Sequence, residues 1–459
     1  MLCSAPTSVF RSVVRSPRLG LGVWRQGVPS VSRRCLLTLA IESSCDDTSV
    51  AILEKEKNAT KIHFLENVTA DTREYGGIHP IVALESHHES MSKLVNKALH
   101  HLPLITGGNS DGGGGQITLA GESQPRRKPD LVAATRGPGM RSNLTIGLET
   151  GKALSVAWQV PFVGVHHMQA HLLTPRLVAS LEGGDGPTQP KFPFLSILVS
   201  GGHSILVRST SIVGHQIMAE SSDIAIGEAL DKTAREVLPP SLLENAKNTM
   251  YGKMLEQFAF PNGAADYTDY RPPRTRGEEF IKKETPWGWA LGTPFANTRT
   301  LEFSFASVAS RAKSLIVAKT KAGVDVSLEE RRALARESMR VAFEHLASRT
   351  IIALETLRQD ASSDKINTLV VSGGVAANRF LMTVLRGFLD VRGFDHVRLV
   401  APPPRLCTDN AAMIGWAGIE MFEAGWHTDL GTQPVRKWAL DAQADDGGIL
   451  GVGGWIRKM

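Results

Sequence analysis

Cysteine is scarce in this sequence, with four residues among 459, and no two of them form a CxxC pair. They are Cys3, Cys35, Cys45 and Cys407. So few thiols exclude a disulfide framework and a structural zinc site built on thiolates, and they are typical of a reduced compartment. The sequence also lacks any uninterrupted run of the ~18 apolar residues that a membrane-spanning helix needs. We therefore expect no membrane span.

Acidic residues and lysine are absent from residues 1–40, which contain several serines and six arginines instead. The arginines are Arg11, Arg15, Arg18, Arg25, Arg33 and Arg34. Without them the net charge of +5 falls to about −1, so the basic pI near 9.0 belongs to this leader. An arginine-rich, acid-free N-terminus predicts a mitochondrial transit peptide over residues 1–35, and a disordered basic tail is the alternative.

The length predicts two or three domains, and 42% apolar with 21% charged residues is typical of a globular protein. Short apolar runs alternate with helical stripes, which predicts an α/β fold with mixed sheets. Strands are expected at residues 36–42, 48–53, 130–135, 161–165, 193–200, 203–207 and 367–372. Helices are expected at 142–158, 166–181, 219–237, 327–357 and 380–389, the first capped by Ser142 and the fourth by Ser327 with Glu330. Residues 258–296 are expected to form a surface insert, and 107–129 and 182–189 to form loops.

The tetrapeptide VSGG occurs twice, at residues 199–202 and 371–374, each time after an apolar run. A glycine pair lets the backbone approach a ligand closely. We therefore predict two facing turns, one from each half of the chain, with a nucleotide between them, and a chance repeat is the alternative. Asn378 follows the second turn, where it either binds a sugar or base or is an ordinary N-terminal helix residue.

His167 and His171 stand four residues apart on an expected helix, so both rings share one face and can bind one metal ion. Met168 stands where a zinc protease has its glutamate, which disfavours that mechanism. Asp409 is a candidate third ligand, and the mixed set suits Fe, Mn or Zn equally. A lone HxxxH pair is also often incidental. The charges of Asp231, Lys232 and Arg235 have the same ambiguity, since they fit an ordinary solvated helix face.

Eight motifs in order over residues 38–417 resemble those of the tRNA threonylcarbamoyladenosine transferases, especially the organellar branch, once labelled O-sialoglycoprotein endopeptidases. They are IESSCDDTSVAIL, the GGIHP and HH region of 76–88, TRGPGMRSNLTIG, GVHHMQAHLL, ILVSGGHS, GEALDKTAR, VVSGGVAANRF and CTDNAAMIGW. The resemblance implies two duplicated ribonuclease-H-like lobes of the actin, Hsp70 and sugar-kinase superfamily around a nucleotide cleft. The N-terminal lobe would span 36–165. The C-terminal lobe would span 166–459, with its last helix returning toward the first lobe.

The resemblance also implies an activity: transfer of threonylcarbamoyl from threonylcarbamoyl-AMP to the exocyclic amine of the adenosine 3′ of the anticodon. The tRNAs would be mitochondrial and read codons that begin with A, a separate synthase would supply the donor, and the protein would work as a homodimer. One divalent metal per subunit would be held by His167, His171 and Asp409, without a covalent protein nucleophile. The substrate site would contain Leu198, Val199, Ser200, Gly201, Gly202, Asp231, Gly252, Glu256, Asn378 and Thr408.

This sequence departs from the family pattern at His166 and Gln169, which replace Asn and Glu beside the metal ligands, and at Gly252, where one glycine replaces a pair. Cys45 has no assigned role. Basic residues within 271–276 and 331–340 are the candidates for contact with tRNA. The main alternative is an ATP-dependent phosphotransferase of the sugar-kinase type, which would need a catalytic Asp and a sugar pocket but no HxxxH pair. An Hsp70-like binding protein would need a separate peptide-binding domain, which we do not expect here.

Overall fold

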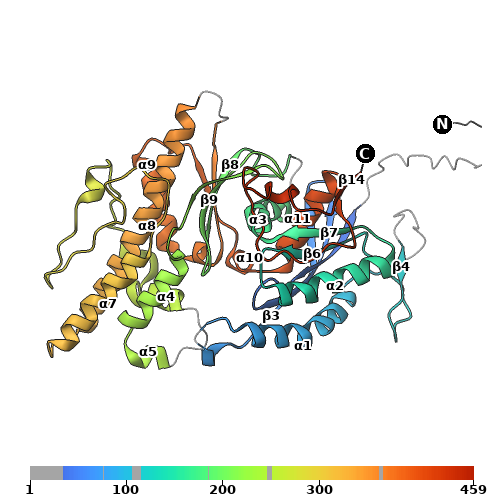
Figure 1. Cartoon of the computed structure of the whole chain (residues 1–459), viewed down its shortest axis with the longest axis horizontal. Coiled ribbons are helices and arrows are strands. Elements are labelled where there is room, and N and C mark those ends of the chain that lie inside the picture. The colour runs from blue at the N-terminus through green and yellow to red at the C-terminus, as the bar shows by residue number, and fades with distance from the viewer. Residues whose placement is uncertain are drawn as a thin grey trace, which may run out of the picture. The chain divides into compact units, whose positions relative to one another are not determined.

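The computed structural model describes residues 35–75, 77–105, 115–183, 186–244, 251–360 and 365–458 (Figure 1). The expected transit peptide lies outside these residues except for residue 35, and so do residues 107–114 of the expected first loop. Within the described part, no helix is both long and apolar enough to cross a membrane.

The first five-stranded sheet has the strand order β3-β2-β1-β6-β7. Its strands are β1 (Leu36–Glu42), β2 (Asp47–Glu56), β3 (Ala59–Thr69), β6 (Leu131–Gly137) and β7 (Phe162–His166). The first three strands pair antiparallel, whereas β1, β6 and β7 run parallel. Residues of β1 alternate between the two faces, so Leu37 and Leu39 join a cluster with α1 (Pro80–Leu99) and α2 (Arg141–Trp158). Ala40 faces the opposite way, toward α3 (His167–Glu182) and α11 (Ala411–Glu423).

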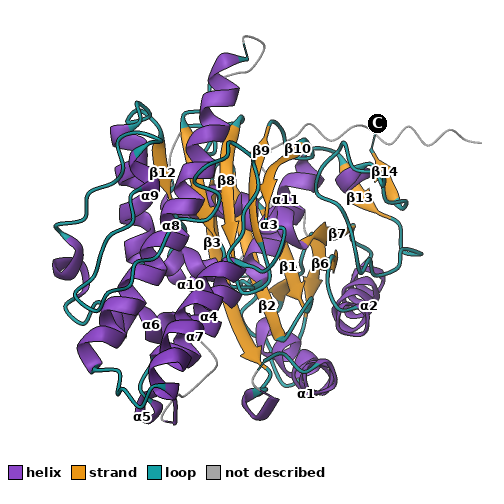
Figure 2. Cartoon of the chain, turned by 60° about the vertical axis from the view of Figure 1, so that its left-hand side comes forward, coloured by secondary structure: helices purple, strands orange, loops and turns teal. Residues whose placement is uncertain are grey.

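The second five-stranded sheet repeats this arrangement with the order β10-β9-β8-β11-β12. Its strands are β8 (Phe194–Val199), β9 (Ser204–Ser209), β10 (His215–Glu220), β11 (Thr368–Ser372) and β12 (Arg398–Val400). Again the first three strands of this order pair antiparallel, whereas β8, β11 and β12 run parallel. The helices that share its largest apolar cluster are α4 (Ile226–Val237), α6 (Tyr251–Ala259), α7 (Ala306–Lys321), α8 (Leu328–Gln359) and α9 (Arg379–Val391). Figure 2 shows them gathered beside this sheet. The repeated order confirms the predicted duplicated α/β fold.

Shorter elements complete the described chain. They are α5 (Pro240–Glu244), α10 (Pro404–Cys407), the paired strands β4 (Gln116–Ile117) with β5 (Arg126–Arg127) and β13 (Trp426–Thr428) with β14 (Trp455–Arg457), and the 3₁₀ turns η1 (Arg73–Tyr75), η3 (Gly263–Tyr267), η4 (Glu278–Phe280), η5 (Gly374–Ala377) and η6 (Gly448–Leu450). The segment 107–129 is therefore not a plain loop, because β4 and β5 form a small hairpin within it.

Two local predictions were wrong. Ser142 does not cap α2, because the helix begins one residue earlier and the Ser142 hydroxyl donates to Oδ1 of Asn143. Residues 219–225 are not helical: β10 continues to Glu220, and a turn follows in which the carboxylate of Asp223 accepts the N–H of Ile224. Ser327, in contrast, caps α8 as predicted by accepting the N–H of Glu330 at 3.1 Å.

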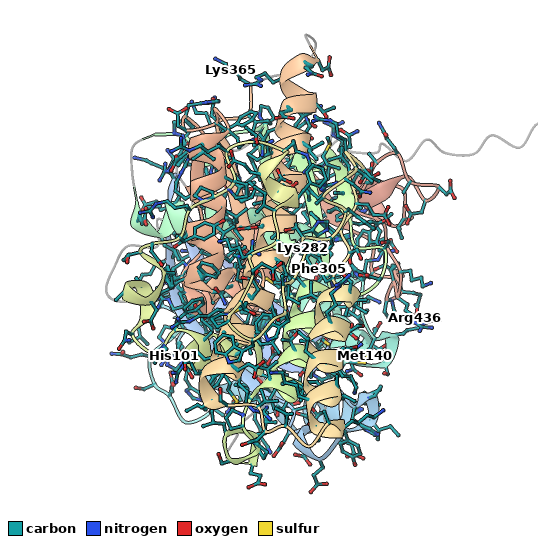
Figure 3. The ribbon with its side chains drawn as sticks, turned by 90° about the vertical axis from the view of Figure 1, so that its left-hand side faces the viewer. His101, Met140, Lys282, Phe305, Lys365 and Arg436 are labelled. Atoms are coloured by element: carbon teal, nitrogen blue, oxygen red, sulfur yellow. The ribbon has the colours of Figure 1, made fainter. Side chains whose placement is uncertain are left out.

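The segment 258–296 is irregular and about half of its residues are exposed, as expected for a surface insert, but a minority of its side chains are buried and anchor it to the protein. Trp289 and Leu291 belong to the same apolar cluster as α8. The carboxylate of Glu279 is bound by Arg276, Arg392 and Ser348, which ties the segment to α8 and to the end of α9. Figure 3 faces this side of the protein, with Lys282 of the segment and Phe305 labelled near its centre.

The two VSGG turns lie in the same sheet, so the prediction of one facing turn from each half was wrong. Both end neighbouring parallel strands, and Leu198 of β8 stands opposite Ser372 of β11. Parallel neighbours end at the same sheet edge, where both chains must turn beside each other. The duplication of the fold instead relates the turn after β1 to the turn after β8, and the turn after β6 to the turn after β11.

Candidate metal and nucleotide site

Three predicted metal ligands come together where α3 begins. His167 is the first residue of α3 and His171 is the fifth. Asp409 directly precedes Asn410, the N-cap residue of α11, whose side chain accepts the N–H of Met413. Nε2 of His171 is 3.0 Å from Oδ1 of Asp409, and Nε2 of His167 is 3.5 Å from the same oxygen. The ligand atoms of all three lie within 4.8 Å of one another. Both histidines are buried, and together with Asp409 they form a group that could hold a metal ion.

A fourth residue, Glu42, supports this cluster and was missed at the sequence level. It is the last residue of β1 and fully buried. Its carboxylate accepts the N–H of Ser44 and the hydroxyl of Thr135, and one oxygen is 3.2 Å from Nδ1 of His167. The only sequence signal was a carboxylate ending an apolar strand immediately before a polar turn.

The electrostatics of the cluster follow from these contacts. Burial alone would lower the pKa of His167, but the carboxylates of Asp409 and Glu42 outweigh it and raise that pKa well above its usual value. Burial acts in the opposite direction on Asp409, where the two histidines nevertheless hold the pKa well below its usual value. The charges of the cluster therefore stabilise one another in the absence of a metal ion.

Two of the three departures from the family pattern, His166 and Gln169, lie on the same helix start as the predicted ligands, but their side chains bond to other parts of the protein. His166 is the N-cap of α3 and accepts the N–H of Gln169, while its Nε2 is 3.1 Å from the carbonyl of Trp438. Burial lowers the pKa of His166 to about 3, so the ring is neutral. The Gln169 amide donates to the carbonyl of Ile212. Both side chains therefore help to place α3.

The turn between β1 and β2 borders the cluster. The carbonyl of Cys45 accepts from Nδ2 of Asn143 at 2.7 Å and lies 3.0 Å from Nε2 of His87. Burial raises the pKa of the Cys45 thiol far above its usual value, and Asp46 adds to the effect. Burial also raises the pKa of Asp47 to about 7. Cys45 is therefore a neutral thiol at physiological pH and a poor nucleophile.

A cavity of about 660 Å³ adjoins this cluster. Thr408 lines the cavity, and the next residue in the chain is the predicted ligand Asp409. The predicted substrate residues in its wall are Gly201, Asp231, Gly252, Glu256, Asn378 and Thr408. The N–H of Gly252 donates to Asp231 at 2.7 Å, and the N–H of Arg379 donates to Glu256 at 2.9 Å. Asn378 is the N-cap residue of α9, where its side chain accepts the N–H of Leu381, and it also lines the cavity.

Other predicted residues lie elsewhere. Leu198 and Val199 are buried in the apolar clusters on opposite faces of the second sheet, so their side chains cannot reach a ligand in the cavity. The Ser200 hydroxyl accepts the N–H groups of Gly202 and His203 and so shapes the turn. Sequence reasoning missed aromatic and apolar members of the cavity wall, which are Leu230, Phe260, Tyr267, Val375 and Pro404.

The predicted basic surfaces are largely engaged within the protein. The Arg331 guanidinium donates to the carbonyl of Val237, Arg336 donates to that of Ala259, and Arg340 pairs with Glu344. Arg276 likewise belongs to the Glu279 cluster. Arg276 and Arg340 therefore have few donors left for phosphates, whereas Arg271 and Arg274 are exposed and the Arg336 side chain is 40% exposed.

The site thus combines an α/β fold with duplicated sheets, a His–His–carboxylate cluster and an adjoining cavity of the size that binds small molecules, which is the arrangement of a small-molecule-binding α/β protein. Comparison with known proteins gives a narrower answer. Residues 123–416 match the family model of tRNA N6-adenosine threonylcarbamoyltransferase. The mitochondrial enzyme of that name from Schizosaccharomyces pombe is 35% identical over 475 residues, covering 100% of this chain and 99% of that protein.

A bacterial protein of the same name, from Novosphingobium aromaticivorans, is 32% identical over 413 residues and covers 89% of this chain and 97% of its own length. Among solved structures, HypF of T. kodakarensis aligns with a TM-score of 0.43 and 13% identity over 86% of this chain and 48% of its own. The chain belongs to the tRNA N6-adenosine threonylcarbamoyltransferase family, and it is a transferase that acts on tRNA.

Proposed function

We propose that this protein transfers the threonylcarbamoyl group from threonylcarbamoyl-AMP to the exocyclic amine of the adenosine 3′ of the anticodon in mitochondrial tRNAs that read codons beginning with A. The observation that carries the proposal is the His167, His171 and Asp409 cluster beside a cavity large enough for a nucleotide. In the reaction, a bond forms between the amine nitrogen and the carbamoyl carbon. The bond between that carbon and the phosphate oxygen breaks, AMP leaves, and the amine releases one proton.

The cluster fits one divalent metal ion. Two imidazoles and a carboxylate are a donor set for Fe, Mn or Zn, and the three ligand atoms already lie within 4.8 Å of one another. His167 and His171 would bind through Nε2, and Asp409 through its carboxylate. When bound, the ion would polarise a carbamoyl or phosphate oxygen. The buried Glu42 would hold the ring of His167 in place.

The cavity would hold the adenylate part of the donor. Asp231 and Glu256 offer carboxylate oxygens to hydroxyl or amino groups, while Gly252, Asn378 and Thr408 complete the wall. The backbone of residues 198–202 would lie along the phosphate, since the side chains of Leu198 and Val199 are buried. No covalent nucleophile is needed, and the raised pKa of Cys45 fits that view.

We further propose that residues 1–35 direct import into mitochondria and that the two lobes span 36–165 and 166–459. The arginine-rich composition of these residues and the name of the mitochondrial relative support import into mitochondria. A separate synthase would supply threonylcarbamoyl-AMP, and the protein would act as a homodimer.

The purified protein should convert an unmodified tRNA for an A-initial codon when threonylcarbamoyl-AMP is added. Digestion of the tRNA and mass spectrometry of its nucleosides would detect threonylcarbamoyladenosine. His171→Ala removes one metal ligand and should abolish the product together with bound metal, whereas His101→Ala changes an exposed histidine and should alter neither. If AMP is released and the tRNA stays unmodified, the acceptor is wrong, and phosphorylation of a sugar with ATP becomes the activity to test.

A further inference from the structure

Tyr267 of η3 places an aromatic ring in the wall of the cavity from within the segment 258–296, which none of the eight family motifs covers. The ring is only 8% exposed. It packs edge-on against Phe260, with ring centres 5.1 Å apart, and against Phe380 of α9 at 5.2 Å. Rings packed on two sides have little freedom to move, so the direction of the hydroxyl is set by the fold.

The hydroxyl of Tyr267 bonds to no group in the described part of the chain. Its pKa is raised, chiefly by burial and further by the nearby Glu256, with Arg379 opposing. The hydroxyl therefore stays protonated at neutral pH, and it can both donate and accept a hydrogen bond. The Tyr267 oxygen is not among the fully buried unpartnered polar atoms of the described residues, so it is accessible to a molecule bound in the cavity and can hydrogen-bond to it.

Tyr270 shows what the same segment does with a structural tyrosine. Its ring also packs edge-on against Phe380, at 5.5 Å, but its hydroxyl donates to Glu344 of α8 at 3.2 Å. It does not line the cavity. Two tyrosines three residues apart therefore share one aromatic cluster, and only one hydroxyl is satisfied by the protein.

We propose that Tyr267 is a specificity-determining residue whose hydroxyl hydrogen-bonds the nucleoside part of the donor. This inference rests on the proposed function. Among the polar side chains that line the cavity, the carboxylates of Asp231 and Glu256 suit the donor groups of a nucleoside, whereas Lys253, Gln257 and Arg379 carry donors of their own. The Tyr267 hydroxyl adds an uncharged donor on a ring held by its aromatic neighbours. Ring nitrogens and sugar oxygens are acceptors, and they need a donor such as the Tyr267 hydroxyl. The segment 258–296 thereby contributes directly to donor binding.

The test uses the full-length protein and AMP as the probe, with Tyr267→Phe and Tyr270→Phe compared by calorimetry. Each variant keeps its ring and loses one hydroxyl. Tyr267→Phe should bind AMP about tenfold more weakly. In transfer assays it should raise KM for threonylcarbamoyl-AMP while leaving KM for tRNA unchanged. Tyr270→Phe should bind AMP like the wild type, even though it loses an internal hydrogen bond.

The outcomes separate this inference from the proposed function. If the wild type binds AMP and Tyr267→Phe binds it equally tightly, the inference is wrong and the proposed function stands. Equal losses in both variants would also contradict it, because the effect would then come from the packing of the aromatic cluster. A wild type that neither binds AMP nor transfers the group would contradict the proposed function itself.

Discussion

The two histidines of the predicted metal site differ in the hydrogen bonds that hold their rings. Nδ1 of His167 faces the buried carboxylate of Glu42 and the hydroxyl of Ser44, each at 3.2 Å. Nδ1 of His171 is buried without a hydrogen-bond partner among the described residues. A carboxylate behind a ligating histidine selects the tautomer whose other nitrogen faces the metal. The ring of His167 is therefore the better oriented of the two.

Replacing this carboxylate should weaken the metal site without removing a ligand. Glu42→Gln keeps the shape of the side chain but loses its charge, and we expect metal affinity to fall by about 10- to 100-fold. Competition between the protein and a chelator for Zn²⁺ measures this directly. Glu66→Gln is the matched control, because Glu66 pairs with Lys97 on the surface at 2.7 Å. If Glu42→Gln binds Zn²⁺ as tightly as the wild type, Glu42 has only a structural role.

The buried carboxyl of Asp231 makes stability depend on pH. Burial raises its pKa from the usual 3.8 to about 6. A carboxyl with a raised pKa binds its proton more tightly in the folded state than in the unfolded state. Ionised Asp231 therefore lowers the free energy of unfolding, and this loss is absent below pH 3.8 and complete above pH 6. Asp231→Asn should therefore raise the free energy of unfolding at pH 7, by on the order of 1 kcal/mol, and much less at pH 4. Urea unfolding at both pH values measures this, and an equal gain at both would refute the assignment.

At the scale of elements, the close approach of β8 and β11 depends on the first glycine after β11. Gly373 has φ of +90°, and a Cβ there would lie 2.3 Å from the carbonyl oxygen of Val199. Gly374 has no atom within 4 Å of the corresponding position. Adjacent glycines of one motif therefore have different roles, one required by the backbone and one leaving room in the cavity wall.

Alanine substitutions should separate these roles. Gly373→Ala should destabilise the protein by more than about 2 kcal/mol, because it combines backbone strain with a clash against a fixed strand. Gly374→Ala should change stability by less than about 0.5 kcal/mol. Urea unfolding of the two variants is the measurement. Comparable losses in both would show that the turn, and not the contact with Val199, sets the cost.

At the scale of the whole molecule, charge is divided between the leader and the rest. The six arginines of residues 1–40 account for the basic pI, and the remainder is close to neutral. Binding of a polyanion such as tRNA must then depend on a local group of basic residues.

Residues 1–35 should act as a mitochondrial targeting signal when they are attached to another protein. Residues 1–35 fused to a fluorescent protein should direct it to mitochondria, and changing all six arginines to glutamine should abolish this, since the positive charge drives recognition. Co-localisation with a mitochondrial dye in eukaryotic cells is the measurement. A six-arginine-to-lysine version is the control and should keep the address. Import of the glutamine version would rule out a charge-based signal.

Much of this protein was predictable from its sequence. Neighbours along the chain determine the strand at residues 36–42, the Ser327 cap and the spacing of His167 and His171 on one helix, so local patterns predicted them correctly. The ordered motifs predicted the family and led to the duplicated fold. Helix boundaries at 142 and 219–225 were wrong because a cap and a third strand depend on partners outside the local window.

Tertiary structure decided the rest. Sheet order placed the two VSGG turns side by side, although they are far apart in sequence. It also brought Glu42 to His167 across 125 residues. The packing of Phe380 against the segment 258–296 directed Tyr267 toward the cavity and Tyr270 toward Glu344. A sequence determines what each side chain can do, but its partner depends on which distant strands and helices are adjacent, and that is a property of the whole fold.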